Sequence, residues 1–471
     1  MRLHAQKLLN ALPPIWPDDL LPAIREQVTQ RNESIVVLDD DPTGTQTVYD
    51  TPILTDWNTD ALRNEFEKAT GLFYVLTNSR SLSSARAEQL ASQIGSNLQE
   101  ASKQTHRKFI VISRSDSTLR GHYPVEADAL AKALGIATAT HVIIPFFKEG
   151  GRLTIGDVHY VLDDDYLIPA AQTPFARDAV FSYKHSDLKE WVQEKTQGRI
   201  ACSSVVSLGL DDIRRGGPEK IAEKLRSCKP HNVCIVNAAL YRDLEVVTLG
   251  LLWAEQQGMR FLYRTAASFV RVIAGLDRRT LVTKDQLHAT ESAGGLIIVG
   301  SHVPRSSAQL THLIRNTGIN AIELRAGKVL SPQTRQTEIQ RVTSLVEKAL
   351  SQAQEIVLYT SRDLVIGSDD EATLSIGSRI SDALVETVKA LKTRPKYILA
   401  KGGITSSDIA TKALGLRRAE VLGQILPGVP VWRTGPESRF PELPYIVFPG
   451  NVGQDDAITC VVRKLRDDTK L

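Results

Sequence analysis

Three consecutive aspartates, Asp39–Asp41, end an apolar run in the segment IVVLDDDPTGTQT (residues 35–47). Adjacent carboxylates repel one another and cannot be buried without partners. A buried strand that ends in so much negative charge therefore needs positive groups nearby. With such groups, the cluster can orient a hydroxyl and accept its proton, or hold a metal for hydrolysis.

Two arginine-bearing segments can supply that positive charge. SRSDSTLRGH (residues 113–122) places Arg114 and Arg120 beside Asp116 and several hydroxyls, directly after the apolar run KFIVIS. TNSRSL ends the neighbouring run and adds Arg80. Arginine holds a carboxylate bidentately, while Asp and Ser can bind hydroxyls, so the mixture suits a polyhydroxy acid. A salt-bridge network without any ligand is the alternative interpretation.

Glycine-bearing turns form a second set of chemically suggestive residues. They occur in LAKGGITSSD (residues 399–408), in PGNVG (residues 449–453) and in VGSHVPRSS (residues 299–307). Backbone N–H groups at a helix N-terminus favour phosphate, and glycine allows close approach to the backbone. The P-loop, dinucleotide and G-x-S-x-G fingerprints are absent. Three such turns in one half of the chain favour phosphate binding.

The elements that must position these residues alternate between strands and helices. Helical spacing is present at residues 83–104, 334–354 and 377–392. Continuous apolar strands separated by helices predict parallel sheets that are covered on both faces. The predicted strands are residues 34–39, 71–78, 108–113, 140–145, 232–237, 294–301, 355–361, 396–403 and 445–451.

The length of 471 residues predicts two domains. We place the boundary in the charged stretch 276–292, which gives an N-terminal domain of residues 1–280 and a C-terminal domain of residues 281–471. In both halves the strands end in small or polar clusters, and open α/β sheets bind ligands at the carboxyl ends of their strands. The fold class is therefore α/β, with two α/β domains, mainly parallel sheets and an active site in the cleft between them.

Composition excludes several classes of protein. The net charge of +3 is weak and interleaved along the chain, so we expect no nucleic-acid partner. No window approaches the roughly 20 apolar residues of a membrane span, and the N-terminal stretch does not read as a signal peptide. We therefore expect a cytoplasmic protein with no membrane partner. Four cysteines are too few for a disulfide framework.

The segment 144–180 lacks helical period and is rich in Gly, Pro and aromatic residues. We interpret it as a long loop, and loops of this length in compact domains are usually functional or disordered; the aromatic residues argue against disorder. His159 lies within it as a candidate ligand or catalytic group, although a lone loop histidine is more often a hydrogen-bonding residue.

Taken together, these motifs resemble the four-carbon acid sugar kinase family. Its Asp-Asp-x-Thr-Gly motif is matched by residues 40–44, and its Lys-x-Asp-Ser-Thr-Leu-Arg-Gly segment by residues 114–121. Residues 151–156 and 175–178 are similar to the family's loop. The C-terminal matches are Gly300-Ser301, Gly402-Gly403-Ile404-Thr405, Pro427-Gly428-Val429-Pro430 and Gly450-Asn451-Val452-Gly453. The resemblance covers nearly the whole chain in the expected order.

The resemblance implies an ATP-dependent kinase that phosphorylates the terminal hydroxyl of threonate, erythronate or an oxo-tetronate in carbohydrate acid catabolism, with Mg²⁺ as cofactor. The N-terminal domain would hold the sugar acid and the C-terminal domain ATP. Transferred by position, the substrate contacts are Asp41, which is also the catalytic candidate, Arg80, Arg114, Ser115, Asp116 and Ser117. The nucleotide contacts are Ser301, Gly402, Gly403, Ile404, Thr405 and Gly450. The metal ligands are not assigned, and a homodimer is left open.

Three segments depart from the family pattern. Arg114 stands where the family has lysine, Ile404 and Ser406 replace the Glu and Ala of Gly-Gly-Glu-Thr-Ala, and Gly-Ser-His-Val (residues 300–303) replaces Gly-Ser-x-Ser. Two other functions therefore stay open. One is a metal-dependent hydrolase or aldolase that acts on a phosphorylated sugar acid. The other is a non-catalytic two-domain sensor of sugar acids.

Overall fold

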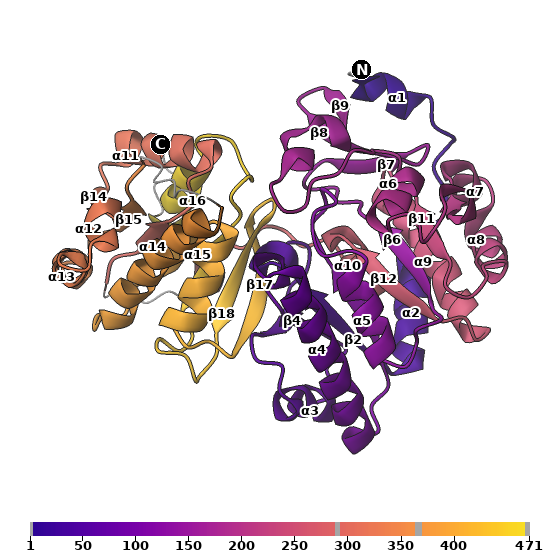
Figure 1. Ribbon diagram of the computed structural model, residues 1–471, viewed down its shortest axis with the longest axis horizontal. Coiled ribbons are helices and arrows are strands. Elements are labelled where there is room, and N and C mark those ends of the chain that lie inside the picture. The colour runs from indigo at the N-terminus through magenta and orange to yellow at the C-terminus, as the bar shows by residue number, and fades with distance from the viewer. Residues whose placement is uncertain (1–2, 288–292, 363–369, 467–471) are drawn as a thin grey trace. The chain divides into compact units, whose positions relative to one another are not determined.

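The computed structural model describes residues 3–287, 293–362 and 370–466, and the chain forms two compact units (Figure 1). The first unit comprises Met1–Val48 and Asp56–Arg278. The second comprises Tyr49–Thr55 and Arg279–Leu471. The change of unit after Arg278 lies close to the boundary that the sequence predicts. The sequence does not predict that Tyr49–Thr55, early in the chain, belongs to the second unit.

A parallel sheet forms the centre of the first unit. Its strands follow the order β10-β11-β6-β12-β5-β2-β4, and each neighbouring pair runs parallel. Every residue of β2, β6, β11 and β12 is buried. Burial on both faces explains why these strands read as continuous apolar runs. The bounds are β2 Ser34–Asp39, β4 Leu72–Leu76, β5 Phe109–Arg114, β6 Thr140–Ile144, β10 Val206–Leu208, β11 Val233–Val236 and β12 Phe261–Thr265.

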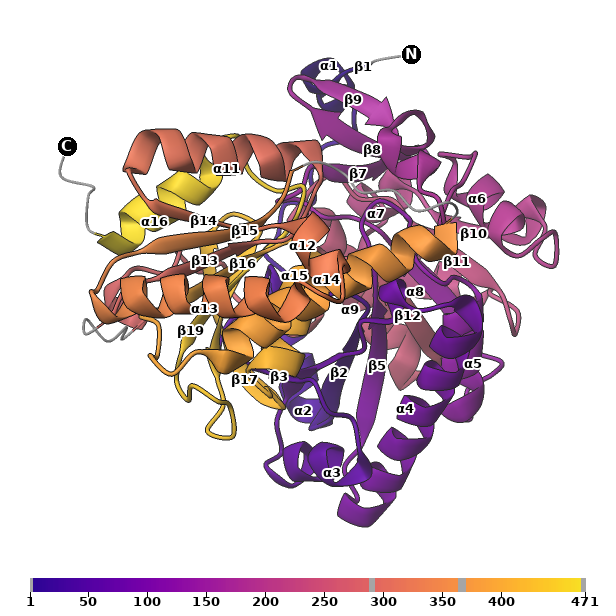
Figure 2. The ribbon, with the colours of Figure 1, turned by 60° about the vertical axis from the view of Figure 1, so that its left-hand side comes forward.

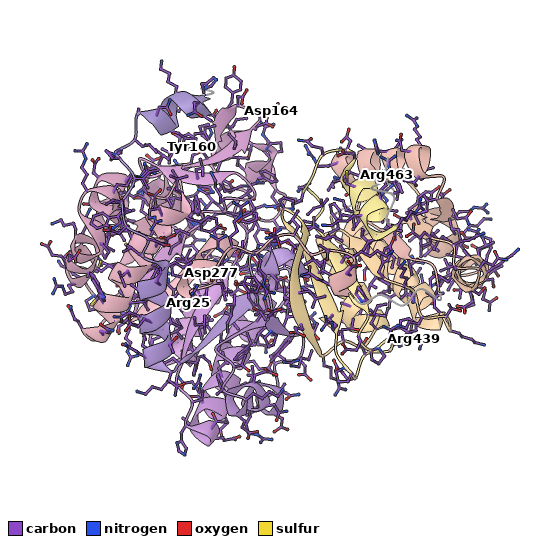
Figure 3. All side chains as sticks on the ribbon, turned by 180° about the vertical axis from the view of Figure 1, so that it is seen from behind. Arg25, Tyr160, Asp164, Asp277, Arg439 and Arg463 are labelled. Carbon is purple, nitrogen blue, oxygen red and sulfur yellow. The ribbon has the colours of Figure 1, made fainter. Side chains whose placement is uncertain are left out.

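Two groups of helices accompany this sheet. In the first group α4 packs against α3 and α5 (Figure 1), and in the second α9 packs against α2, α7, α8 and α10. The ion pair of Arg25 with Asp277 (2.7 Å) ties α2 to the chain beyond α10, and both residues are labelled in Figure 3. The bounds are α1 Ala5–Asn10, α2 Leu21–Arg31, α3 Thr59–Glu67, α4 Ser84–Thr105, α5 Val125–Ala133, α6 Leu188–Lys195, α7 Leu210–Arg214, α8 Gly217–Arg226, α9 Tyr241–Gln256 and α10 Ala267–Ile273.

The pattern of small residues explains the contact between α4 and α5. Ala87, Ala91, Ile94, Leu98 and Ala101 are buried at spacings of three and four, which places them on one face of α4. On the same helix a Cβ atom added to the glycine at position 95 would lie 2.7 Å from a side chain of α5. The helix therefore approaches its neighbour closely at this glycine, on a face that carries alanines among its larger side chains.

The prediction of a long loop at residues 144–180 is wrong. The segment forms three antiparallel strands, β7 Arg152–Ile155, β8 Val158–Asp163 and β9 Tyr166–Pro169. The strand β1 Leu3–His4 pairs with β9 and completes the small sheet, on which Tyr160 is labelled in Figure 3. The strands are short and their turns are glycine- and aspartate-rich, so the turn residues mask the strand period in the sequence.

The sheet of the second unit is mixed rather than purely parallel. Its strands follow the order β3-β17-β18-β19-β16-β13-β15-β14. The pairs from β3 to β19 are antiparallel, and those from β19 to β14 are parallel. β17 alternates half-buried and buried residues, which is the pattern of a strand with only one face covered. The bounds are β3 Thr51–Leu54, β13 Leu296–Val299, β14 Asn320–Leu324, β15 Ile356–Thr360, β16 Ile398–Lys401, β17 Arg418–Leu426, β18 Val429–Thr434 and β19 Pro444–Phe448.

Helices cover both faces of the parallel part of this sheet. Figure 2 shows α11 with α16 on one side of the strands and α13 with α14 on the other, and both helix pairs are in contact. The bounds are α11 Pro304–Thr317, α12 Ala326–Leu330, α13 Arg335–Ser351, α14 Asp370–Ala390, α15 Gly403–Asp408 and α16 Ala457–Arg466, with a π-helical turn at Ile409–Ala413.

The nine strands predicted from the sequence are confirmed, as β2, β4, β5, β6, β11, β13, β15, β16 and β19. The α/β class is confirmed as well, although the mainly parallel description holds for the first unit better than for the second. Within the part of the chain that the structure describes, no helix is both long enough and apolar enough to span a membrane.

Candidate functional site

Adjacent strand ends bring the predicted substrate residues together in the first unit. The strands β5, β2 and β4 are neighbours, and Asp39 at the end of β2 lies opposite Arg114 at the end of β5. The short 3-10 turn Ser79–Ser81, which carries Arg80, follows β4. Because parallel strands end at one edge of a sheet, the aspartates and both arginines converge there.

Asp39 is the most deeply buried of the three aspartates, with no exposed surface. Its Oδ1 accepts a hydrogen bond from Nη1 of Arg114 at 2.9 Å. Burial raises the pKa of Asp39 to about 7, although Arg114 opposes the increase. A Cβ atom on Gly44 would lie 2.0 Å from Oδ2 of Asp39, so the glycine leaves room for this carboxylate. The sequence assigns no role to Asp39, whereas the structure makes it the buried partner of Arg114.

Asp40 anchors the segment that follows β5. Its Oδ2 accepts a hydrogen bond from the hydroxyl of Ser115 at 2.6 Å. Its Oδ1 lies 3.7 Å from Nη2 of Arg80 and 3.7 Å from Nη1 of Arg114. Asp40 therefore lies near two guanidinium groups and one hydroxyl. It connects the loop that follows β2 to the segment that follows β5.

Asp41 forms the tightest contact with Arg80. Oδ2 of Asp41 lies 2.7 Å from Nη2 of Arg80, and Oδ1 accepts hydrogen bonds from the N–H (2.9 Å) and the hydroxyl (2.5 Å) of Thr43. Burial alone would raise the pKa of Asp41, but Arg80 and the two Thr43 hydrogen bonds outweigh it and lower the pKa. Asp41 is therefore ionised, and its side chain is only partly exposed.

Two arginines lie close to the carboxylate of Asp116. Its Oδ2 accepts a hydrogen bond from Nε of Arg120 at 2.7 Å and one from the hydroxyl of Thr118, and its Oδ1 lies 3.4 Å from Nη1 of Arg80. Burial raises the pKa of Asp116, but Arg120 and Arg80 more than offset this and lower it. Arg80 thus bridges Asp41 and Asp116. Ser117, the next residue along the chain, is buried.

Arg264, which the sequence analysis misses, also belongs to this site. It lies in β12, next to β5, and donates from Nη1 to Ser113 Oγ (2.7 Å) and to Glu126 Oε2 (2.9 Å). Its Nη2 donates to Ser115 Oγ at 2.7 Å. A single charge inside the apolar run FLYRT (residues 261–265) is the signal that could have revealed it.

His159 supports the site structurally rather than facing a ligand. It is fully buried on β8, where Nε2 contacts the backbone carbonyl of Ser117 (2.8 Å) and Nδ1 contacts the hydroxyl of Thr154 (2.9 Å). Burial lowers the pKa of His159 to about 4, although the Ser117 carbonyl opposes this. A neutral imidazole therefore links the small sheet to the Ser115–Ser117 segment.

The predicted nucleotide residues converge in the second unit. A Cβ atom on Gly402 would lie 2.9 Å from Cβ of Ser301, and one on Gly450 would lie 3.8 Å from its Oγ. A Cβ atom on Gly300 would lie 2.4 Å from Oγ1 of Thr405. Gly402 also has φ +109°, a backbone conformation that favours glycine. The turns after β13, β16 and β19 therefore lie close together, and those at Gly300 and Gly402 have no room for larger side chains.

Neighbouring helices hold these turns. Gly403 begins α15, and Ile404 on its first turn exposes 62% of its surface. On α11, Gln309 donates from Nε2 to the carbonyl of Val452 at 3.0 Å, which fixes the PGNVG turn. Nη2 of Arg362, beyond β15, donates to the carbonyl of Ser301 at 2.8 Å. Arg362 was not predicted from the sequence.

Lys401 is a further basic residue that was not predicted from the sequence. It ends β16, immediately before the glycine turn, and has no exposed surface. Its Nζ donates to the carbonyl of Pro449 at 2.6 Å and lies 4.2 Å from the ring centroid of Phe448. Burial, together with the smaller effect of the charge of Arg305, lowers the pKa of Lys401 to about 7.

Metal ligation is not evident from side chains alone. Across residues 3–287, 293–362 and 370–466, no group of three or more His, Cys, Asp or Glu side chains is arranged to hold a metal ion. The carboxylates of the first unit that could contribute to such a site, Asp41 and Asp116, are engaged by arginines.

Comparisons with known proteins show similarity over most of the chain. A D-erythronate kinase from Heliobacterium modesticaldum is 25% identical over 367 residues, which cover 74% of this chain and 78% of that protein. A Salmonella typhimurium LT2 structure described as a proposed tRNA synthase has a TM-score of 0.67 at 16% identity, covering 92% of this chain and 99% of the other. Haemophilus influenzae protein HI1011 has a TM-score of 0.61 at 16% identity, covering 91% and 100%. The two structures share the fold.

Two family models match the chain in sequence order. The model described as a sugar-binding N-terminal domain matches residues 35–273, and the model described as a nucleotide-binding C-terminal domain matches residues 296–458. The first match alone covers more than half of the 471 residues. The strand-end site lies within it, and the glycine turns lie within the second. The chain belongs to the four-carbon acid sugar kinase family.

Proposed function

We propose that this protein is an ATP-dependent kinase that transfers a phosphoryl group to the terminal hydroxyl of a four-carbon sugar acid, with erythronate, threonate and an oxo-tetronate as candidates. The observation that carries the proposal is the meeting of Asp41, Arg80 and Asp116 at adjacent strand ends within the sugar-binding match. Family membership and the D-erythronate kinase relative support the same reaction class.

In this proposal the first unit binds the sugar acid. Arg80 and Arg114 provide positive charge, while Ser115, Asp116 and Ser117 contact hydroxyls. Asp41 orients the attacking hydroxyl. Its lowered pKa makes it a weak base, so orientation and electrostatic guidance are its main contribution, and it takes the proton only as transfer proceeds.

The second unit binds ATP. We propose that Ser301, the turn Gly402–Thr405 with Gly403 and Ile404, and Gly450 contact the nucleotide. Close packing of the turns leaves their backbone N–H groups as the donors for phosphate. Mg²⁺ is commonly held by one or two carboxylates together with substrate phosphates, so it would enter with ATP and neutralise the charge of the transferred group.

A test of the reaction follows ADP release with ATP, Mg²⁺ and a panel of four-carbon acids. We expect ADP with at least one acid, and loss of most turnover in Asp41→Asn. Near-normal turnover in that variant would remove Asp41 from the reaction. Turnover of a phosphorylated acid without ATP would indicate a hydrolase or aldolase. Binding of an acid with no ADP from any acid would indicate a sensor.

We propose in addition that the protein acts in the cytoplasm, in carbohydrate acid catabolism, and binds no nucleic acid. A homodimer is a further hypothesis, and light scattering of the purified protein at two concentrations would test it. A mass of one chain, 51.9 kDa, at both concentrations would refute it.

A further inference from the structure

The arginines that line the strand-end site already have carboxylate partners. Arg80 lies 2.7 Å from Asp41, and Arg114 lies 2.9 Å from Asp39. The pairs of Arg120 with Asp116 (2.7 Å) and of Arg264 with Glu126 (2.9 Å) complete the set. A sugar acid that arrived at any of these four would compete with an existing ion pair. Breaking a buried ion pair costs several kcal/mol.

Arg152 differs from these four arginines. It is the first residue of β7, and its guanidinium carbon lies 5.6 Å from the ring centroid of Phe175. Within the described part of the chain, no ion pair joins its guanidinium to a carboxylate, and its Nε is buried with no hydrogen-bond partner. Arg152 therefore carries a charge that nothing nearby neutralises directly.

The position of Arg152 places it beside the strand-end site. Arg120, which holds Asp116, lies over the same Phe175 ring at 5.2 Å. His159 lies on β8, the strand that pairs with β7, and it contacts the carbonyl of Ser117. Burial lowers the pKa of Arg152, and the more distant Asp116 offsets this only in part. An anion bound at Arg152 would relieve that cost of burial.

We propose that Arg152 binds the carboxylate of the sugar acid. Phe175 contacts the guanidinium through its ring, and the two outer nitrogens would make a bidentate contact with the carboxylate. The arginine–aspartate pairs then position the hydroxyl-bearing end of the substrate rather than its carboxylate. The proposal rests on the proposed function and adds to it the residue that distinguishes an acid from a neutral four-carbon polyol.

The experiment compares wild type with Arg152→Met and Arg152→Lys, using the acid that gives ADP. For Arg152→Met we expect KM for the acid to rise about 10- to 100-fold, with kcat and KM for ATP within a factor of two of wild type. Arg152→Lys keeps the charge but loses the fork, so its KM should fall between the two. Arg177→Met, at an exposed arginine of the neighbouring turn, is the matched control and should leave KM unchanged.

A neutral competitor separates carboxylate recognition from general damage. Erythritol or threitol lacks the carboxylate, so its inhibition constant should be the same in wild type and Arg152→Met. An equal loss of affinity for the acid and the polyol, or an unchanged KM for the acid, would overturn the proposal. If Arg152→Met does not fold, the same comparison is made with Arg152→Lys.

A second readout makes the proposal independent of turnover. If wild type releases no ADP with any acid, the proposed reaction fails, and calorimetric binding of erythronate and threonate then tests Arg152 alone. Weaker acid binding by Arg152→Met would still support the carboxylate site. Equal binding by both proteins would reject it.

Discussion

Replacing the buried Lys401 by methionine tests how the amine beneath the glycine turn affects the stability of the second unit. The pKa of Lys401 is lowered from 10.5 to about 7 by burial. A difference of this size corresponds to roughly 5 kcal/mol between the neutral and charged forms. Methionine keeps the apolar stem and can pack on Phe448, but it loses the 2.6 Å hydrogen bond from Nζ to Pro449.

The sign of the pH dependence follows from the lowered pKa. The contribution of Lys401 to stability is fully present above its unfolded pKa of 10.5 and is lost as pH falls through about 7. Between these values the unfolded chain binds one proton more than the folded chain, so stability should rise by about 1.4 kcal/mol per pH unit. Relative to Lys401→Met, wild type should therefore gain roughly 2–3 kcal/mol from pH 7.5 to 9.5.

Urea unfolding of both proteins at pH 7.5, 8.5 and 9.5, followed by tryptophan fluorescence, measures this difference. Trp432 is fully buried and is the tryptophan of the second unit. Lys412→Met is the control, because that lysine is half-exposed and pairs with Asp408 at 2.9 Å. Its difference from wild type should not change with pH over this range. A constant difference for Lys401→Met would show that the buried amine stays charged, and would refute the reasoning.

Three further substitutions test a close contact, a buried ion pair and an exposed side chain. Gly44→Ala places a Cβ atom 2.0 Å from the carboxylate of Asp39, so we expect a loss of roughly 1–3 kcal/mol in the free energy of unfolding and a lower Tm. Asp243→Asn breaks the buried bidentate contact with Arg214 (2.7 and 3.0 Å), and urea unfolding should show a loss of about 3–5 kcal/mol. Ile404→Glu changes an exposed side chain, and calorimetry should show stability within about 0.5 kcal/mol of wild type.

Each of these three predictions has a control variant or a result that would contradict it. Gly71→Ala is matched to Gly44→Ala, because a Cβ atom at Gly71 would meet nothing within 4 Å, and equal losses in the two variants would contradict the steric explanation. Asp211→Asn removes an exposed partner of Arg215 and should cost less than about 1 kcal/mol. A Tm loss of many degrees in Ile404→Glu would mean that the side chain packs against the protein.

Much of the fold could be predicted because buried parallel strands leave a local signal. β2, β6 and β11 are short apolar runs, and each was predicted to within a residue or two. The strand β17 was missed because its buried residues alternate with polar or half-buried ones, so that it contains no continuous apolar run. The small sheet β7–β9 was missed because its turns dominate the composition of the segment.

The sequence predicted which strand-end residues would lie close together, but it did not predict their interaction partners. The motif spacing placed Asp41, Arg80 and Asp116 at neighbouring strand ends, and their side chains do meet. The spacing of the motifs did not reveal Arg264 or Lys401. Each is a single charged residue in an otherwise apolar strand and belongs to no recognisable motif. Their roles depend on which strands are neighbours in the sheet.

By itself, the sequence determined the family, the alternation of strands and helices, and the strand ends that carry charge, because these depend on residue type and local spacing. Tertiary structure alone decided how the three aspartates differ. Asp39 faces the interior with Arg114 and has a raised pKa, whereas Asp41 faces Arg80 and has a lowered one. Burial and the nearest opposite charge set a carboxylate's pKa, and both depend on strand order in the sheet, which no local sequence pattern contains.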